Sequence, residues 1–197
     1  MKPTAAAAWC GIAALLVAGC NAGSSGEDPA TVASSQAKLA VSVPPAPAQR
    51  NQGRQDVVFD PCFRIDDATI ERAGYDPRTR KRSDFIADRY SFLGCEFEHK
   101  EKGLLIRSVT IDSTNLTLEE YRSRYSNSLT NTSVAGREAV MYQLPGDSAN
   151  TTCFLAMKSL DGVLELQLNV NEARTADRAC DLIQGTAETI EPSLPRA

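Results

Sequence analysis

Apolar and polar residues alternate most regularly between residues 163 and 171. Leucine or valine occupies every second position from Leu164 to Val170, and polar residues such as Glu165 lie between them. This period of two predicts a β-strand that buries its apolar face and leaves the face with Glu165 in water. The same alternation predicts further strands, over residues 90–98, 104–112, 139–144 and 151–158.

Other stretches repeat their apolar residues at the spacing of an α-helix. Thr117 and Glu120 form a capping-box sequence, which predicts a helix over residues 118–128. A short helix is expected over residues 66–73, and a C-terminal helix with an apolar stripe over residues 175–190.

The order of these elements indicates the fold class. A helix and a β-hairpin come first, a second helix follows, and further strands and a last helix complete the chain. Residues 134–138 are expected to be a strand interrupted by a turn or a bulge. Because short connections favour antiparallel neighbours, we expect a single α+β domain with an antiparallel sheet of about five strands covered by helices.

The N-terminus has the parts of a bacterial export signal. Lys2 supplies a positive charge, and an apolar run follows over residues 5–19. A run of about 15 residues suits a signal peptide and is short for a membrane-spanning helix. The small residues directly before Cys20 are similar to the lipobox of bacterial lipoproteins. We expect residues 1–19 to be a cleaved lipoprotein signal peptide and Cys20 to be diacylated.

Lipidation would anchor the protein on the outer face of the cytoplasmic membrane, because several acyl chains on one residue hold a protein stably at a bilayer. The alternative is an ordinary signal peptide, or an uncleaved anchor, with a chance cysteine. Residues 20–56 are rich in Gly, Ser, Ala, Pro and Gln, a composition that buries too little apolar area to offset the entropy of ordering. We therefore expect a flexible tether over residues 20–56 and the folded domain over residues 57–197.

The chain has six cysteines, and the expected domain contains Cys62, Cys95, Cys153 and Cys180. An even number of cysteines in an exported domain predicts disulfides, and four cysteines allow three pairings. We favour Cys62–Cys95 and Cys153–Cys180, because each would join a helical segment to a strand. Each would close a loop of about 30 residues and stabilise the fold by about 3 kcal/mol in the chain-entropy model. Metal ligation and redox catalysis are the rival interpretations, but the cysteines are scattered and CxxC is absent.

The densest group of cations in the chain consists of Arg78, Arg80, Lys81 and Arg82. Such a group can contact anionic lipid headgroups or anionic envelope polymers. The simpler interpretation is a solvated surface loop. We expect a loop at these positions, and these four residues are the candidates for contact with an anionic surface.

The composition and the motifs argue against several classes of function. A formal net charge of −4, from 25 acidic and 21 basic residues, argues against nucleic acid as a partner. The single histidine, His99, stands in a charged turn, and GxSxG, HExxH and phosphate-binding glycine motifs are absent. Paired acids at 66–67 and 119–120 lie at helix starts, where carboxylates are expected structurally. We expect no cofactor and no metal.

Tyr121 and Tyr125 fall on one face of the helix predicted over residues 118–128. Tyrosines at this spacing could stack on a ligand. Packing in the core, with the hydroxyl groups at its rim, is the simpler interpretation and the one we expect.

Several short sequences follow one another in a characteristic order after the lipobox. They are Asp60-Pro61-Cys62, Gly74-Tyr75-Asp76-Pro77, Cys95-Glu96-Phe97, Gly136-Arg137-Glu138-Ala139, Cys153 and Cys180. Together they resemble the actinobacterial lipoproteins grouped as domain of unknown function 3558, over roughly residues 57–190 and the signal. The resemblance implies an envelope lipoprotein with two disulfides. It implies no catalytic residues, because the family has no assigned activity.

We therefore expect a non-enzymatic ligand-binding or protein-interaction module, held at the membrane by its lipid, whose partner is an envelope lipid, polymer or protein. The alternative is a carboxylate-based hydrolase acting on envelope substrates, which would need two acids with raised pKa values in a deep pocket. An assembly accessory of another envelope machine would instead expose an apolar patch.

Overall fold

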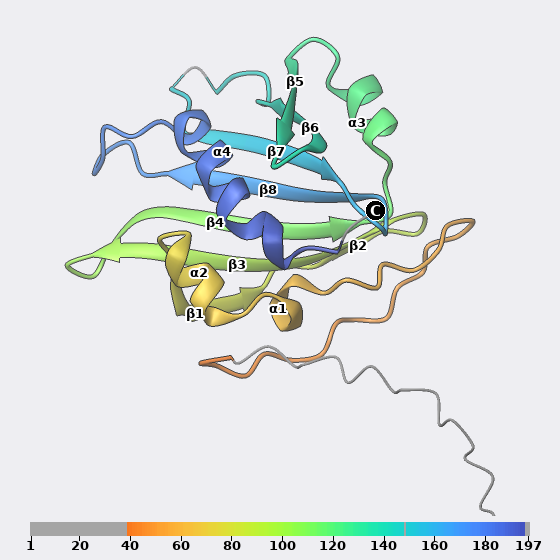
Figure 1. Ribbon diagram of the computed structural model, residues 1–197, viewed down its shortest axis with the longest axis horizontal. Coiled ribbons are helices and arrows are strands. Elements are labelled where there is room, and N and C mark those ends of the chain that lie inside the picture. Colours follow the sequence, from red (N-terminus) through yellow and green to blue (C-terminus); the bar gives the residue numbers. More distant parts are fainter. Residues whose placement is uncertain (1–38, 148, 196–197) are drawn as a thin grey trace, which may run out of the picture. The chain divides into compact units, whose positions relative to one another are not determined.

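The computed structural model describes residues 39–147 and 149–195. In this part of the chain, one antiparallel sheet contains eight strands in the order β1-β3-β4-β8-β7-β6-β5, and β2 pairs with β3 (Figure 1). The α+β class is confirmed, but the sheet is wider than the five strands expected. The strands are β1 (Asp76–Arg82), β2 (Phe85–Ile86), β3 (Ser91–Glu101), β4 (Leu104–Thr114), β5 (Leu129–Val134), β6 (Arg137–Tyr142), β7 (Thr152–Lys158) and β8 (Val163–Val170).

The helices are shorter than the strands. They are α1 (Pro61–Arg64), α2 (Asp67–Arg72), α3 (Leu118–Arg124) and α4 (Ala179–Ile190), followed by the 3-10 turn η1 (Glu191–Ser193). Helix α3 begins with the predicted capping box of Thr117 and Glu120. Helix α4 begins later than the predicted residue 175, because Arg174 and Thr175 close a turn onto the carbonyl of Asn171.

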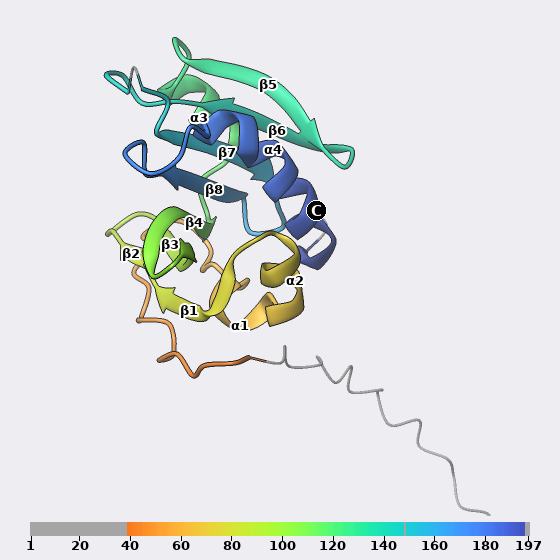
Figure 2. The ribbon, with the colours of Figure 1, turned by 90° about the vertical axis from the view of Figure 1, so that its left-hand side faces the viewer.

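Helices α1, α2 and α4 cover one face of the sheet (Figures 1 and 2). The main core lies between them and the strands, where Leu164, Leu166 and Leu168 of β8 form one buried cluster with Ile183 and Ile190 of α4. The alternation that predicted β8 therefore marks the face that meets these helices.

Helix α3 packs on the opposite face of the sheet. Its side chains Leu118 and Tyr121 form a second buried cluster with Val140 of β6 and Phe154 of β7. This helix has only seven residues, so it covers part of the face over β6, β7 and β8. The sheet is thus buried on both faces at its centre and on one face elsewhere.

The prediction of a loop at Arg78, Arg80, Lys81 and Arg82 is wrong. Residues 76–82 form β1, which pairs with β3 at one edge of the sheet. Alternation did not reveal this strand, because its inward-facing positions hold Pro77 and Arg80 in place of large apolar residues. β5 was missed for a related reason, since threonine, asparagine and serine occupy most of its positions.

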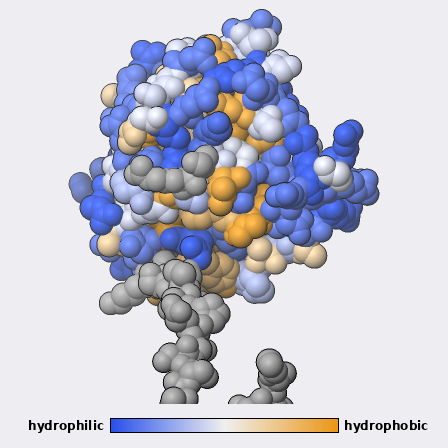
Figure 3. All heavy atoms as spheres, turned by 45° about the vertical axis from the view of Figure 1, so that its right-hand side comes forward, coloured by the Kyte–Doolittle hydropathy of each residue, from blue (hydrophilic) through white to orange (hydrophobic). Residues whose placement is uncertain are grey.

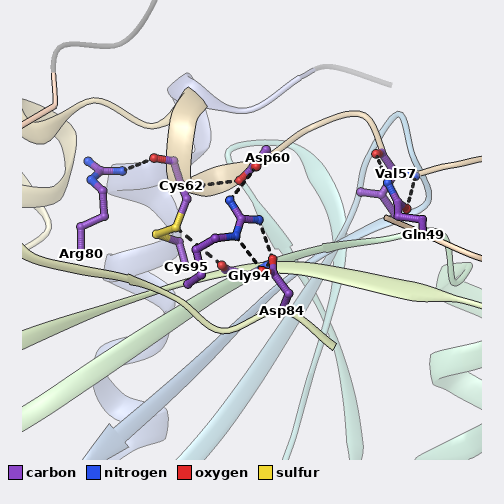
Figure 4. Close-up of polar contacts among 9 residues, drawn as sticks. Gln49, Val57, Asp60, Cys62, Arg80, Asp84, Gly94 and Cys95 are labelled. Atoms are coloured by element: carbon purple, nitrogen blue, oxygen red, sulfur yellow. Dashed lines mark hydrogen bonds and ion pairs between the residues drawn. A yellow bond between two sulfur atoms is a disulfide. The ribbon is translucent and has the colours of Figure 1, made fainter. Parts of the chain in front are cut away.

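The last part of the predicted tether lies against the domain. Asn51 is buried, and its side chain bonds to Gln49, Asp56 and Ser91. The side chain of Gln49 also bonds to both the N–H and the carbonyl of Val57 (Figure 4). These contacts attach the chain before residue 57 to β3.

A further contact joins this segment to α3. Arg54 forms an ion pair with Glu120 at 2.5 Å and donates to the carbonyl of Asn115. The hydrogen bond from Arg54 is the main reason why the pKa of Glu120 is lowered to about 2. The N-terminal segment therefore contributes to holding α3 in place.

Both favoured disulfides are present. Cys62 of α1 bonds to Cys95 of β3, and Cys153 of β7 bonds to Cys180 of α4. All three helices on the main-core face are thus held near the sheet, since α2 follows α1 after two residues.

We predict that replacing Cys153 and Cys180 together by serine lowers the free energy of unfolding by about 3 kcal/mol, because the unfolded chain regains the entropy of an open loop. Urea unfolding of both forms under non-reducing conditions measures this difference. Equal unfolding midpoints and slopes would contradict a stabilising role for this disulfide.

Candidate functional site

Two of the four cations proposed to contact an anionic surface, Arg80 and Arg82, form their ion pairs inside the domain. Arg80 is 4% exposed, and its guanidinium donates to the carbonyls of Cys62 and Ile65 and to Asp67 at 2.7 Å. Figure 4 shows Arg80 beside the Cys62–Cys95 disulfide. Arg80 therefore attaches α1 and α2 to β1, and its charge does not face the solvent.

Arg82 has a similar structural role. Its guanidinium forms ion pairs with the carboxylates of Asp60 and Asp84, at 2.8 and 2.5 Å. Figure 4 shows these two acids near the Cys62–Cys95 disulfide. The other two cations, Arg78 and Lys81, are more exposed and pair with Asp76 and with acids of β3 respectively. Because each cation has an acidic partner, this region has little net positive charge to offer a membrane.

The face of the sheet beneath α3 holds an unexpected buried acid. Glu165 is 7% exposed, although the alternation of β8 predicted that it would face water. Its two carboxylate oxygens accept hydrogen bonds from the hydroxyls of Tyr121, at 2.7 Å, and Tyr142. The prediction is wrong because α3 and β6 bring these tyrosines over the face that the sequence pattern marks as polar.

The tyrosines belong to a stack of rings. Tyr142 lies between the rings of Tyr125 and Phe154, with centroid separations of 4.0 and 4.9 Å and nearly parallel planes. Core packing of Tyr121, which the sequence suggested, is thus found, with its hydroxyl directed at Glu165.

A second acid lies beside Glu165. Asp112 of β4 is the register partner of Glu165 on one side and of Gly94 on the other. A Cβ atom at position 94 would collide with the carboxylate of Asp112 and the hydroxyl of Ser83. Gly94 is therefore needed to make space for Asp112.

Burial raises the pKa values of both acids in this pair. Burial raises the pKa of Asp112 well above its ordinary value, and the nearby charges of Glu165 and Asp84 raise it further. Burial likewise raises the pKa of Glu165, although the two tyrosine hydroxyls act in the opposite direction. Raised pKa values in adjacent acids are one of the two features that a carboxylate hydrolase needs.

The other feature, a deep pocket, is not found beside Glu165. The cavity there has a volume of about 30 Å³, which holds one or two water molecules and no sugar ring or peptide. Its walls come mainly from α3 and the strands that it covers: Phe92, Leu116, Glu120, Tyr121, Arg124, Tyr125 and Glu165.

Two apolar side chains are exposed together at another place. Val58 and Leu160 are 81% and 69% exposed, and both line a groove of about 180 Å³ with Phe59 and Pro195. Figure 3 shows hydrophobic residues gathered in small groups among hydrophilic ones on one face of the molecule. We call the pair formed by Val58 and Leu160 the apolar pair.

The apolar pair is held in place by a carboxylate. Asp161, in the turn after β7, accepts hydrogen bonds from the backbone N–H groups of Val58 and Phe59 at 2.9 and 2.7 Å. Gly162 closes this turn, and a Cβ atom there would collide with the backbone of Leu116 and Thr114. The two exposed side chains therefore sit on a rigid support, as the anchor residues of protein interfaces do.

Two further grooves are polar. One of about 310 Å³ continues from Leu160 and Asp161 towards Glu119 and Arg122 of α3. The other, of about 520 Å³, lies between α2 and the β3–β4 hairpin and is lined by Glu71, Asp76, Arg78, His99 and Arg107. Ala40, Gly74, Tyr75 and Pro77 also line this groove, so charged and uncharged residues share its walls.

The described part of the chain contains neither a metal-binding group of side chains nor a membrane-spanning helix. Among residues 39–147 and 149–195, no three histidine, cysteine, aspartate or glutamate side chains are close enough together to hold a metal ion. In the same residues, no helix has the length and apolarity needed to cross a membrane. Cys20 and the predicted signal peptide lie outside the described residues.

Comparison with known families gives one result. The model of the family described as "Protein of unknown function (DUF3558)" matches residues 15–193. The chain belongs to this family. No curated protein and no solved structure matches the chain significantly.

The sequences that suggested the DUF3558 family have structural roles. Asp60 caps α1, and Pro61 is the first residue of that helix. Arg137 forms a buried ion pair with Glu191 of η1 at 2.8 Å and donates to the carbonyls of Lys158 and Pro195. These residues therefore explain how the C-terminus and α1 are attached to the sheet, and they identify no reactive centre.

Sequence reasoning missed both the acid pair and the apolar pair. No local signal marked Asp112 or Glu165, because each lies at the polar position of an ordinary alternating strand. The Leu160-Asp161-Gly162 sequence indicated a turn, but the partner of Asp161 is a segment about a hundred residues earlier.

We predict that Asp112→Asn stabilises the protein at neutral pH, on the order of 1–3 kcal/mol, because it removes a buried charge that repels Glu165. Folding raises the pKa of Asp112 above its ordinary value of 3.8. The ionised carboxylate therefore lowers the free energy of unfolding above pH 3.8, and this effect is lost at lower pH, where the carboxyl is protonated in both states. The advantage of the variant is therefore expected at pH 7 and should vanish below pH 3.8.

Urea unfolding of the wild type and Asp112→Asn at several pH values measures this difference. Asp88→Asn is a matched control, because Asp88 is an exposed acid that forms an ion pair with exposed Arg50. A wild type that is as stable as Asp112→Asn at every pH would contradict the repulsion argument.

Proposed function

We propose that this DUF3558 protein is a lipid-anchored module on the outer face of the cytoplasmic membrane that binds a partner protein of the cell envelope without catalysing a reaction. The observation that carries the proposal is the apolar pair, Val58 and Leu160, which Asp161 holds in an exposed position.

The location is supported by the sequence and by the disulfides. The small residues before Cys20 resemble a lipobox, and the family match begins at residue 15, inside that stretch. Disulfides persist in oxidising compartments outside the cytoplasm, and two are present in the domain. Both features agree with export and anchoring at Cys20.

The size of the apolar groove supports a protein as the partner. Small-molecule sites usually have volumes of about 300–1,000 Å³. The groove of about 180 Å³ beside the apolar pair is smaller and suits one or two apolar side chains of another protein. Apolar residues that are exposed side by side can mark a site of protein–protein interaction.

The hydrolase alternative has weaker support. Asp112 and Glu165 are adjacent and have raised pKa values, but both oxygens of Glu165 bond to tyrosines and the cavity beside it is about 30 Å³. A substrate would have to displace α3 to reach the carboxylate of Glu165. A purified protein that hydrolyses an envelope polymer, and loses that activity in Glu165→Gln, would overturn our proposal.

For the anchor, we predict that Cys20→Ala releases the protein from the membrane, because the acyl chains have no other attachment point. Cell fractionation and labelling with a radioactive fatty acid measure retention and acylation. Cys10→Ala is the matched control, since Cys10 precedes the expected cleavage site and should have no effect. Full membrane retention of Cys20→Ala would contradict lipid anchoring.

For the partner, a photo-crosslinking residue at position 58 in living cells should capture one protein of defined mass. Leu160→Glu should lower that yield at least tenfold, because a charge in the centre of an apolar contact must be desolvated. Leu144→Glu is the matched control, as Leu144 is 45% exposed elsewhere on the surface. A yield that Leu160→Glu leaves unchanged, or the same products from a crosslinker at position 144, would contradict this role of the apolar pair.

A further inference from the structure

We propose that β5 is a self-association edge, at which a second copy of this chain pairs antiparallel with the first and extends the sheet across a twofold axis. The proposal concerns a different surface from the apolar pair and does not depend on the proposed function. β5 ends the strand order of the sheet, and no other described strand pairs with its outer side (Figure 2).

The two ends of the sheet are built differently. Edge strands usually carry charges, proline or bulges, which prevent pairing with another chain. β1 has all three: Pro77, four cations and a register shift between Asp76 and Lys81. β5, with the sequence Leu-Thr-Asn-Thr-Ser-Val, has no charge and no proline, and its pairing with β6 is regular. Of these two edge strands, only β5 therefore lacks the features that usually prevent an edge strand from pairing with another chain.

The hairpin turn shows which backbone groups of β5 are available. Ala135 and Gly136 both have positive φ angles, so they form a two-residue turn that closes on the hydrogen-bonded pair Val134 and Arg137. Hydrogen-bonded and non-hydrogen-bonded pairs alternate from there. The N–H and carbonyl groups of Ser133, Asn131 and Leu129 therefore point away from β6.

One contact agrees with this assignment. The carbonyl of Ser133 accepts a hydrogen bond from the side chain of Gln184 in α4, which requires that it point away from β6. A carbonyl oxygen can accept a second hydrogen bond. Within residues 39–147 and 149–195, the outward backbone groups of Asn131 and Leu129 have no hydrogen-bond partner.

A second copy fits this edge because β5 is complementary to itself. With Asn131 at the twofold axis, Leu129 faces Ser133 of the partner subunit, and each facing pair exchanges both of its N–H···O bonds. Thr130 then lies opposite Thr132 of the partner subunit. Threonine pairs stabilise antiparallel strands, and the absence of charge in β5 means that no like charges face each other.

The test is sedimentation velocity of the full chain in excess mild detergent, over a wide series of concentrations. We expect a monomer–dimer equilibrium for the wild type. Asn131→Pro should weaken it at least tenfold, because proline removes the outward N–H at the axis without removing a bond to β6. Asn131→Lys should weaken it similarly by placing two cations opposite each other, and it covers the case in which the proline variant fails to fold.

Two controls make the test specific to this edge and register. Asn127→Lys, in the exposed turn before β5, adds the same charge away from the edge and should leave the dimer intact. A mixture of Asn131→Lys and Asn131→Asp should recover a mixed dimer, because opposite charges then meet at the axis. A wild type that stays monomeric at every concentration, or a dimer that Asn131→Pro and Asn131→Lys leave unchanged, would overturn the proposal.

Discussion

The burial of the central strands on both faces is the constraint on which the rest of the structure depends. β8 and β7 lie in the middle of the sheet, and their side chains are buried on both faces. The main-core face receives three helices, which disulfides and the ion pairs of Arg80 and Arg82 attach to the strands. These ion pairs neutralise the charges of Arg80 and Arg82. Two members of the densest basic sequence of the chain therefore add little positive charge to the surface.

The opposite face has much less helix to cover it. One seven-residue helix lies there, and Glu165 of β8 is enclosed beneath it with two tyrosine hydroxyls as partners, while Asp112 of β4 lies beside Glu165 and is partly covered. Burying two carboxylates in one place opposes folding unless one of them is neutral or well hydrogen-bonded. The acid pair therefore makes the stability of the protein depend on pH, and the cavity beside Glu165 has a volume of only about 30 Å³.

The surfaces that carry the two proposals differ in their physical basis. At the apolar pair, binding would remove exposed apolar side chains from water, and the carboxylate of Asp161 holds these side chains in place. Such a surface suits a partner with a matching apolar residue. At the β5 edge, binding would form backbone hydrogen bonds to an uncharged strand. Such a surface suits another β-strand. Since the surfaces share no residue, a dimer formed through β5 would present two copies of the apolar pair.

The sequence alone determined the class of the fold, the central strands and the family, because these depend on local alternation and short motifs. It favoured one of three disulfide pairings, and the packed structure confirmed that pairing. It also placed the start of α3 correctly, since a capping box acts within one turn of helix. Only the tertiary structure decided that β1 and β5 are strands, that Arg80 is buried and that Glu165 is enclosed. In each case the deciding neighbour is distant in the sequence: Asp67 and β3 for Arg80, and α3 with β6 for Glu165. A polar residue looks the same in the sequence whether water or a folded segment covers it, so its environment is settled only when the chain is packed.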